Sequence, residues 1–319
     1  MSKILEVKNL NVGFNLSGGF QQAVYDVSFS LEKGETLAIV GESGCGKTVS
    51  TMSILQLLPE TATIKSGEIF YDGNNILGFN QKQMQKIRGK KIALIPQDPM
   101  TSLNPLYTIG NQLLEIIELH QNVKGKEAFD IAVKALERVK IPDAKEKMKA
   151  YPHEFSGGMK QRVIIAMALA CNAEIIIADE PTTALDVTVQ AQIMDILKEI
   201  KENGNVSIIL ITHDLGVVAE NADKIAVMYA GNIVEYSSKD ELFNNPKHPY
   251  TKALLNVVLD IKSKSVQTIE GQPPSITDNI SGCPFHPRCC ECMEICTNVK
   301  PLLRMLDSGS KVACHLYDV

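Results

Sequence analysis

The sequence has no excess of basic residues: 32 lysines and arginines stand against 37 aspartates and glutamates, and the formal net charge is −5. Because nucleic-acid backbones bind basic surfaces, this composition argues against a nucleic-acid partner. The chain also lacks a long unbroken apolar run, since Asn172 and Glu174 interrupt the longest one, 163–178. Residues 1–6 have no signal-peptide apolar region. These absences predict a cytoplasmic chain that does not itself cross a membrane.

The length and the cysteines indicate two modules. A chain of 319 residues exceeds the usual size of a single core, so we expect one large α/β domain and an appendage. Six of the eight cysteines lie between Cys283 and Cys314. In a reducing cytosol such a cluster favours a metal site over disulfides.

The strongest local pattern is a phosphate-binding loop of the form G-x-x-x-x-G-K-S/T. Its residues are Gly41, Glu42, Ser43, Gly44, Cys45, Gly46, Lys47 and Thr48. An apolar run suited to a buried strand precedes it at 36–40, and helical apolar spacing follows at 49–58. Backbone N–H groups in such a loop, and the helix N-terminus after it, point at phosphate oxygens. Both flanks fit, which disfavours a purely structural turn and predicts a nucleoside triphosphate as ligand.

Two residues of the loop have side chains suited to specific roles. Lys47 is expected to reach the β and γ phosphates. Thr48 offers a hydroxyl to Mg²⁺, a cation that prefers hard oxygen ligands. Cys45 is interpreted as a small residue within the loop.

The first region predicts an antiparallel layer. Residues 5–10 and 24–31 alternate like strands around a glycine-containing loop, and strands are expected again at 66–73 and 92–95. Phe14 is a candidate for stacking on an adenine ring, although an isolated phenylalanine is more often part of a core.

The region 100–170 is predicted to be mainly helical, with helical periodicity at 109–119 and 126–139. Near its end a Ser-Gly-Gly turn opens into an apolar helix at 163–170. Exposed N–H groups and a helix N-terminus make this turn a candidate second anion site. Its residues are Ser156, Gly157 and Gly158.

Polar side chains follow three of the predicted strands. The apolar run 174–178 leads into Asp179, which is suited to hold Mg²⁺, and Glu180, which is suited to orient and polarise an attacking water. Gln97 follows 92–95 and is a candidate for contact with Mg²⁺ or that water, although alone it is only a loop glutamine. His213 ends the buried strand 207–212 and is a candidate contact of the γ-phosphate, where a structural histidine is the alternative.

Taken together, these motifs resemble those of ATP-binding cassette (ABC) transporter ATPases over residues 4–235. The resemblance identifies the loop at 41–48 as Walker A, Gln97 as the glutamine loop, Ser156-Gly157-Gly158 as the signature, Asp179-Glu180 as Walker B, Ala184-Leu185-Asp186 as the D-loop and His213 as the switch. It implies an α/β fold with a RecA-like P-loop core, an antiparallel β subdomain and a helical subdomain at 100–170. Met159 and Phe155 replace the usual glutamine and leucine around the signature, which leaves the strength of the signature open.

The same resemblance implies that two cassettes enclose two ATP molecules head to tail, each bound by one Walker A loop and the partner's signature. Phe14 matches the adenine-stacking position of the family. The second cassette is expected to be a paralogous subunit, forming a heterodimer, or a second copy of this chain.

A narrower resemblance comes from residues 236–319, which look like the C-terminal extension of dipeptide/oligopeptide permease ATPases. It rests on His248-Pro249-Tyr250-Thr251-Lys252-Ala253-Leu254-Leu255, Gly271-Gln272-Pro273-Pro274 and Gly282-Cys283-Pro284-Phe285-His286-Pro287-Arg288-Cys289. Relatives of this kind imply a 4Fe–4S cluster on Cys283, Cys289, Cys296 and Cys314. Four thiolates also suit Zn²⁺, and a cluster of metal-free thiols is the remaining alternative. Cys290 and Cys292 are possible competing ligands.

The resemblance implies an ATPase at the cytoplasmic face of a membrane, working with two permease subunits and, indirectly, with an extracytoplasmic peptide-binding protein. Nickel importers share this branch, so nickel or another small solute is the alternative cargo. A soluble cassette ATPase of repair or translation is disfavoured, because the chain has neither long coiled coils nor two fused cassettes. The tail has too little apolar content for a core of its own. Nothing places its metal centre beside the nucleotide, so ATP hydrolysis is not expected to require that centre.

Overall fold

The computed structural model describes residues 2–183, 185–204, 206–259, 269–278 and 280–318. The chain divides into two compact units, one made of 1–78 and 211–319 and the other of 79–210. The strand β8 (Ser207–Thr212) is fully buried and crosses this division. Among the described residues, no helix is both long and apolar enough to span a membrane.

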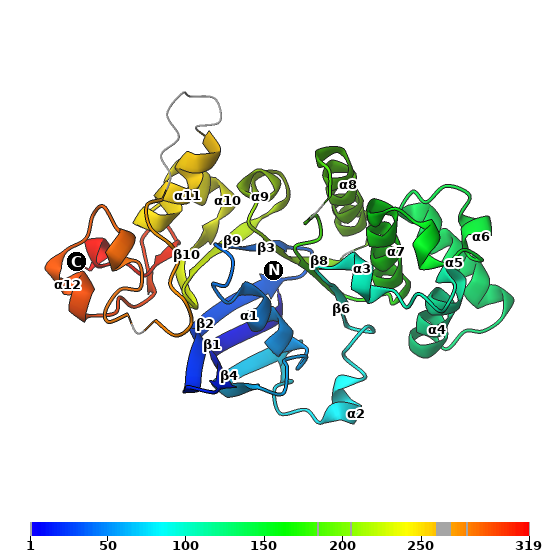
Figure 1. The fold of residues 1–319 in the computed structure, drawn as a ribbon, viewed down its shortest axis with the longest axis horizontal. Helices are drawn as coiled ribbons and strands as arrows, with labels where there is room; N and C mark the ends of the chain where they lie inside the picture. Colours follow the sequence, from blue (N-terminus) through cyan, green and yellow to red (C-terminus); the bar gives the residue numbers. More distant parts are fainter. Residues whose placement is uncertain (1, 184, 205, 260–268, 279, 319) are drawn as a thin grey trace. The chain divides into compact units, whose positions relative to one another are not determined.

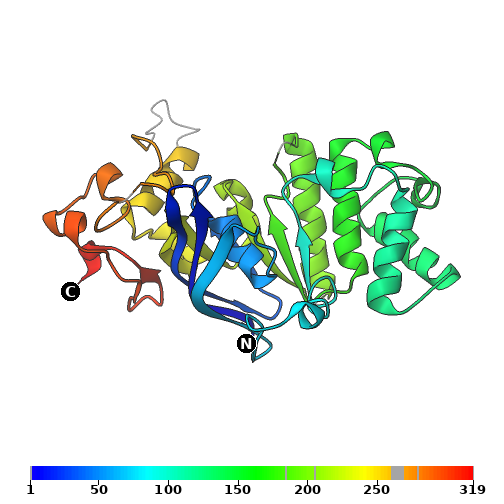
Figure 2. The same ribbon diagram turned by 60° about the horizontal axis from the view of Figure 1, so that its bottom comes forward.

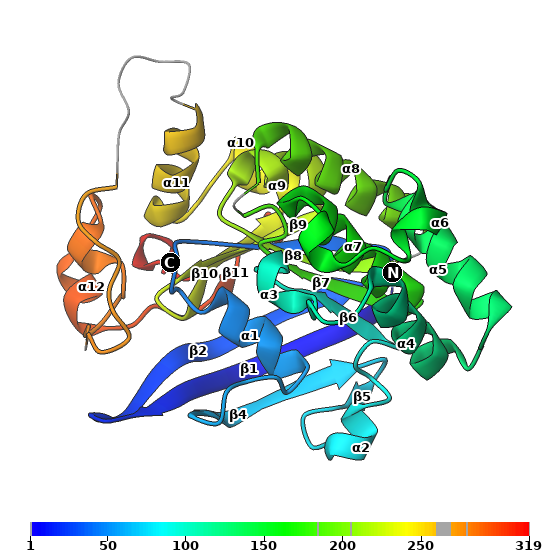
Figure 3. The same ribbon diagram turned by 45° about the vertical axis from the view of Figure 1, so that its right-hand side comes forward.

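The first unit begins with an antiparallel sheet (Figure 1). Its strands lie in the order β2 (Gly19–Glu32), β1 (Lys3–Leu16), β4 (Ala62–Tyr71) and β5 (Asn74–Asn75). Apolar side chains along β1, including Val7 and Leu10, are fully or nearly fully buried. Figure 3 shows α1 (Lys47–Ile54) on one face of this sheet, in contact with β1 and β2. The predicted antiparallel layer is therefore confirmed.

A second group of strands in this unit carries the phosphate loop. The buried strand β3 (Thr36–Val40) pairs in parallel with β9 (Lys224–Tyr229), with Val40 opposite Val227. Antiparallel pairing then adds β10 (Asn232–Ser238), β12 (Lys311–Val312) and β11 (Arg304–Met305). The tail thus contributes strands to the same sheet as the loop's own strand.

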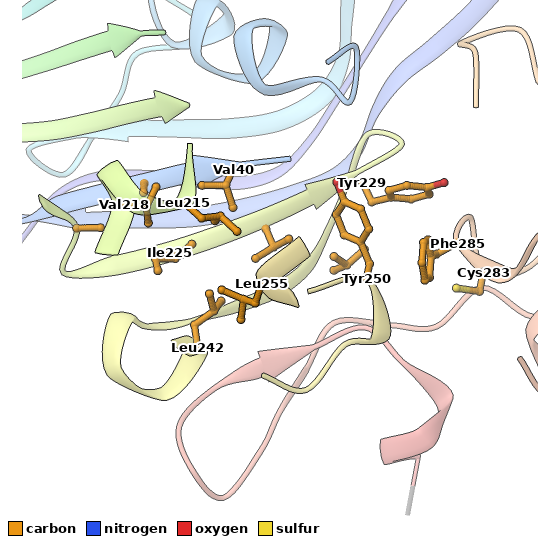
Figure 4. Packing of buried hydrophobic residues seen from close by; sticks show 14 of the residues in the cluster. Val40, Leu215, Val218, Ile225, Tyr229, Leu242, Tyr250, Leu255, Cys283 and Phe285 are labelled. Atoms are coloured by element: carbon orange, nitrogen blue, oxygen red, sulfur yellow. The ribbon is translucent and has the colours of Figure 1, made fainter. Parts of the chain in front are cut away.

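The tail also shares a hydrophobic core with these strands (Figure 4). Phe285 packs against Tyr229 and Tyr250, with ring centroids 5.1 and 5.3 Å apart. Around them lie the helices α9 (Leu215–Asn221), α10 (Lys239–Asn244), α11 (Pro249–Leu259) and α12 (Glu294–Asn298). The tail's apolar side chains therefore complete the core of the cassette's strands. The predicted domain boundary between residues 235 and 236 falls inside this unit and stays a prediction.

The second unit contains a parallel strand pair and a group of helices. The strand β6 (Ile92–Ile95) pairs with β7 (Ile175–Asp179). In Figure 2 the helices α4 (Ile109–Gln121), α5 (Lys126–Arg138) and α7 (Gly157–Ala170), drawn in green, lie side by side and contact one another. The remaining elements are α2 (Gln81–Met84), α3 (Pro99–Ser102), α6 (Ala144–Lys147), the 3₁₀ turn Pro152–Glu154 and α8 (Val187–Gly204).

Two predicted helix boundaries are wrong. The helix expected at 49–58 ends at Ile54, because Gln56 adopts a left-handed φ of 50° and its side chain donates to the carbonyls of Ile76 and Leu77. The helix expected at 163–170 begins earlier, at Gly157, because Ser156 caps it.

Candidate active site

The phosphate loop follows β3 and closes tightly on itself. Gly41 has a φ of 151°, and a Cβ there would lie 2.2 Å from the carbonyl oxygen of Met228. Gly46 precedes α1 with a φ of 98°, in the left-handed region that favours glycine. Both glycines are therefore required by the backbone path, as the motif predicts.

Lys47 begins α1 and lies against the loop it follows. Its side chain is buried, and Nζ donates to the carbonyl oxygens of Gly41 (2.9 Å) and Glu42 (3.0 Å). Ser43, Gly44 and Thr48 are exposed. Cys45 is buried, and burial raises the pKa of its thiol, which fits a small packing residue. The loop thus combines exposed positions with a buried lysine.

Glu42, the second residue of the loop, is held by the tail. Arg288 donates to its carboxylate from two nitrogens, Nη1 to Oε2 at 2.7 Å and Nη2 to Oε1 at 3.1 Å. The backbone N–H of Glu42 donates to the hydroxyl of Tyr250 at 3.1 Å. A tail arginine therefore contacts the phosphate loop itself.

A buried carboxylate sets the position of Tyr250. Glu235 is fully buried on β10 and accepts from the backbone N–H groups of Lys247 (2.9 Å) and His248 (2.8 Å). The N–H of Tyr250 in turn donates to Nδ1 of His248 at 3.0 Å, which places the proton of the neutral ring on Nε2. Burial lowers the pKa of His248 to about 3, so this histidine is neutral at physiological pH.

Sequence reasoning missed Glu42, Tyr250 and Arg288 as members of the site. Glu42 occupies a variable position of the motif, and the other two stood only in segments that carried the family resemblance. No sequence motif predicts a contact between residues so far apart in the chain. The acidic residue inside the phosphate loop is nevertheless a signal, because its charge predicts a basic partner.

Phe14 and His213 belong to the same unit as the loop. Phe14 is half-buried on β1, opposite Gln21 of β2 and Ala62 of β4. His213 is exposed and follows β8 directly. Their roles toward adenine and the γ-phosphate stay predictions.

In the second unit, the side chains of Gln97 and Glu180 contact each other. The Nε2 of Gln97 donates to Glu180 Oε2 at 3.0 Å, and the hydroxyl of Thr183 donates to the same oxygen at 2.9 Å. Glu180 has a φ of 45°, a strained conformation for a non-glycine residue that is found most often at functional sites. Asp179, the last residue of β7, is 1% exposed. The strand therefore ends in one buried carboxylate and one that is held by two side chains.

The Ser-Gly-Gly segment forms a helix N-terminus. Ser156 is exposed, and its Oγ accepts from the N–H of Met159 at 3.3 Å. A Cβ at Gly158 would lie 2.6 Å from a methyl carbon of Val189, so this glycine permits the close approach of α7 and α8. Asp186 accepts from the N–H of Val189 at 2.9 Å, and Ala184 of the predicted D-loop lies outside the described residues.

The tail cysteines lie in one region, but they do not form a metal-binding group. Cys283 and Cys296 are buried, and the N–H of Cys283 donates to the carbonyl oxygen of Cys296 at 2.8 Å. Burial, with a smaller contribution from neighbouring thiolates, raises the pKa of Cys283 to about 11 and that of Cys289 to about 12. In the part of the chain that the structure describes, no three His, Cys, Asp or Glu side chains are arranged to hold a metal ion. The residues therefore do not fit a metal centre as they stand.

Two family models match the chain. The model of the ABC transporter covers residues 24–183, and the model of the oligopeptide/dipeptide transporter C-terminal region covers residues 234–296. The chain is 49% identical to the dipeptide transport ATP-binding protein DppD of Bacillus subtilis (strain 168), over 100% of this chain and 96% of that protein. It is 50% identical to the oligopeptide transport ATP-binding protein OppD of Escherichia coli (strain K12), over 94% and 89%.

Solved structures show the same fold. A dimeric post-hydrolysis state of the ATP-binding cassette MJ0796, bound to ADP and Pi, matches with a TM-score of 0.66 and 27% identity, over 74% of this chain and 98% of that one. The cbiO1 subunit of the cbiONQ ABC transporter complex from Clostridium perfringens matches with a TM-score of 0.66 and 28% identity, over 77% and 92%. The predicted α/β cassette fold is confirmed.

Proposed function

The chain belongs to the ATP-binding proteins of ABC transporters, and we propose that it is the ATP-hydrolysing subunit of a membrane importer of dipeptides or oligopeptides. One observation carries this proposal. The likeness to peptide transport ATP-binding proteins extends through the tail, where the oligopeptide/dipeptide C-terminal model matches 234–296. A general cassette likeness would stop before this segment.

In this proposal each group of the site has one task in the transfer of a phosphoryl group to water. The loop's N–H groups and Lys47 bind the triphosphate, and Phe14 stacks on the adenine. When bound, Mg²⁺ neutralises charge on the β and γ phosphates, and Thr48, Gln97 and Asp179 are its proposed protein contacts.

Glu180 is the proposed residue that orients and polarises the attacking water. Its carboxylate is already restrained by hydrogen bonds from Gln97 and Thr183, at 3.0 and 2.9 Å. Such restraint keeps the accepting oxygen in place, which general-base chemistry requires. His213 is proposed to contact the γ-phosphate.

The proposed partners are a second cassette and two permease subunits. Ser156, Gly157, Gly158 and Asp186 then face the ATP held by the partner cassette, and the dimeric state of MJ0796 supports such pairing. The second cassette is either a paralogous subunit, which gives a heterodimer, or a second copy of this chain. The complex would lie at the cytoplasmic membrane face, receive cargo from an extracytoplasmic binding protein and bind no nucleic acid.

We further propose that the tail takes up a 4Fe–4S cluster on Cys283, Cys289, Cys296 and Cys314, with Zn²⁺ as the alternative. Four thiols within one short segment support the proposal, since thiolates are the ligands of such clusters. Because the four do not form a metal-binding group among the described residues, ligation would require their side chains to rearrange. ATP hydrolysis is not routed through this cluster.

Co-purification tests the assembly. When the chain is tagged and expressed with candidate permease subunits from the same organism, the expected result is a detergent-stable complex that contains the permeases and hydrolyses ATP. An ATPase that never retains a permease would favour a soluble cassette, and a complex that transports nickel instead of peptide would favour the alternative cargo.

A further inference from the structure

We propose that Arg288 of the tail is a positioning residue that acts through Glu42: it neutralises the Glu42 carboxylate and so keeps this charge from repelling a nucleoside triphosphate at the phosphate loop. The proposal rests on the proposed function of the loop as an ATP site. It assigns to the tail a direct part in nucleotide affinity.

The contact has the geometry of a strong charge-assisted pair. Two parallel N–H···O bonds join Arg288 to Glu42, at 2.7 and 3.1 Å. The side chain of Arg288 is 6% exposed and that of Glu42 is 23% exposed, so solvent screens the pair less than an open surface pair. Planar, bidentate pairs of this kind fix orientation as well as charge.

The remaining donors of Arg288 are held by fixed acceptors. Nε donates to the carbonyl oxygen of Glu270 at 2.9 Å, Nη2 donates to that of Gly271 at 3.2 Å, and Nη1 donates to the hydroxyl of Tyr229 at 3.3 Å. Arg288 therefore bonds to the tail and to the core strand β9 while its guanidinium faces the loop.

The contacts of Glu42 extend to Lys47, the lysine of the motif. Glu42 is held at its carboxylate by Arg288 and at its N–H by Tyr250, and its carbonyl accepts from Lys47 Nζ at 3.0 Å. A shift of Glu42 would therefore move an acceptor of Lys47. An unpaired carboxylate in this loop would also repel an incoming triphosphate.

The test is a double-mutant cycle read by the affinity of full-length protein for Mg-ATP, measured by calorimetry. Arg288→Gln is expected to weaken binding about tenfold, the order expected for one uncompensated charge at a partly exposed site. The turnover number at saturating ATP should stay within about threefold of wild type, since the chemical groups are untouched. Arg288→Lys should recover part of the loss, because it keeps the charge without the bidentate fork.

Adding Glu42→Gln to Arg288→Gln is the decisive step. If the arginine acts by neutralising Glu42, the double variant should bind Mg-ATP within about threefold of wild type, because the repelling charge is gone. Glu42→Gln alone should bind at least as tightly as wild type. Arg304→Gln is the matched control, since it breaks a tail ion pair with Asp318, at 3.2 Å, outside the phosphate loop.

Each outcome has a clear meaning. Unchanged affinity in Arg288→Gln, or failure of Glu42→Gln to restore it, overturns the inference. If limited proteolysis shows that Arg288→Gln unfolds the tail, the Mg-ATP affinity of the Glu42→Gln variant becomes the test. A tenfold weaker affinity in that variant contradicts the proposal that the Glu42 charge repels the nucleotide. Wild-type protein that binds no Mg-ATP would instead refute the proposed function.

Discussion

At the scale of single residues, the local contacts of Glu180 in the second unit support its proposed role. Glu180 is held in a left-handed backbone conformation with its carboxylate bonded to Gln97 and Thr183. Strain of this kind persists only where surrounding contacts over-determine it. These two hydrogen bonds fix the direction of Oε2 of the carboxylate.

Glu180→Gln is expected to leave Mg-ATP binding intact and to reduce ATP turnover about 10²-fold or more, because the amide keeps the shape and loses the base. A stable ATP-bound dimer should accumulate, which size-exclusion chromatography would detect. Glu115→Gln, on the exposed face of α4, is the matched control and should be silent. Turnover within about threefold of wild type would remove Glu180 from the proposed role.

The residues of the nucleotide site could be named from the sequence where a motif fixes their spacing. Lys47, Asp179 and Glu180 fall at fixed positions of such motifs, whereas the hydrogen bond between Gln97 and Glu180 was not predicted. The Arg288–Glu42 pair could not be predicted, because its partners are 246 residues apart and only the folded tail brings them together.

At the scale of elements, the presence of strands and helices was predicted more reliably than their ends: the strand expected at 5–10 extends over 3–16, whereas the helices expected to begin at 109 and 126 do so. The strand expected at 207–212 matches β8 to the residue, because a fully buried strand is a continuous apolar run. The helix α1 ends earlier than predicted because Gln56 adopts a left-handed conformation, and α7 begins earlier because Ser156 caps it. The spacing of apolar residues does not indicate such helix ends.

The tail is the element whose chemistry needs a direct test. Protein purified without oxygen is expected to be brown, with iron and sulfide near about four per chain, as a 4Fe–4S cluster requires. Cys289→Ser or Cys296→Ser should lower the metal content and expose the tail to proteolysis, because ligation contributes folding energy. Cys171→Ser, in the second unit, is the control and should keep the metal.

The alternatives for the tail give distinct results. Colourless protein with one zinc would decide for Zn²⁺, and metal-free protein prepared anaerobically would remove the site. Metal content unchanged by Cys289→Ser would assign a ligand role to the exposed Cys290 or Cys292.

At the scale of the whole molecule, the chain is organised so that the tail belongs to the unit of the phosphate loop. Residues 211–319 cluster with 1–78, and Phe285 shares a core with Tyr229 and Tyr250. The sequence indicated two modules, and it could not reveal this shared core, because each tail segment taken alone is too poor in apolar residues to predict packing. The tail thus packs into the unit that contains the phosphate loop. We therefore expect that disruption of the tail lowers the affinity for nucleotide.

The central claim is that this chain hydrolyses ATP to drive peptide import, and peptide uptake tests it most directly. The complex of this chain with its permeases and binding protein is reconstituted in liposomes with ATP on the side of the cassettes, and entry of a labelled dipeptide and a labelled oligopeptide is followed. The account predicts ATP-dependent uptake of at least one of the two, abolished by Glu180→Gln and unaffected by Glu115→Gln. ATP hydrolysis without entry of either peptide, or entry of nickel alone, would contradict it.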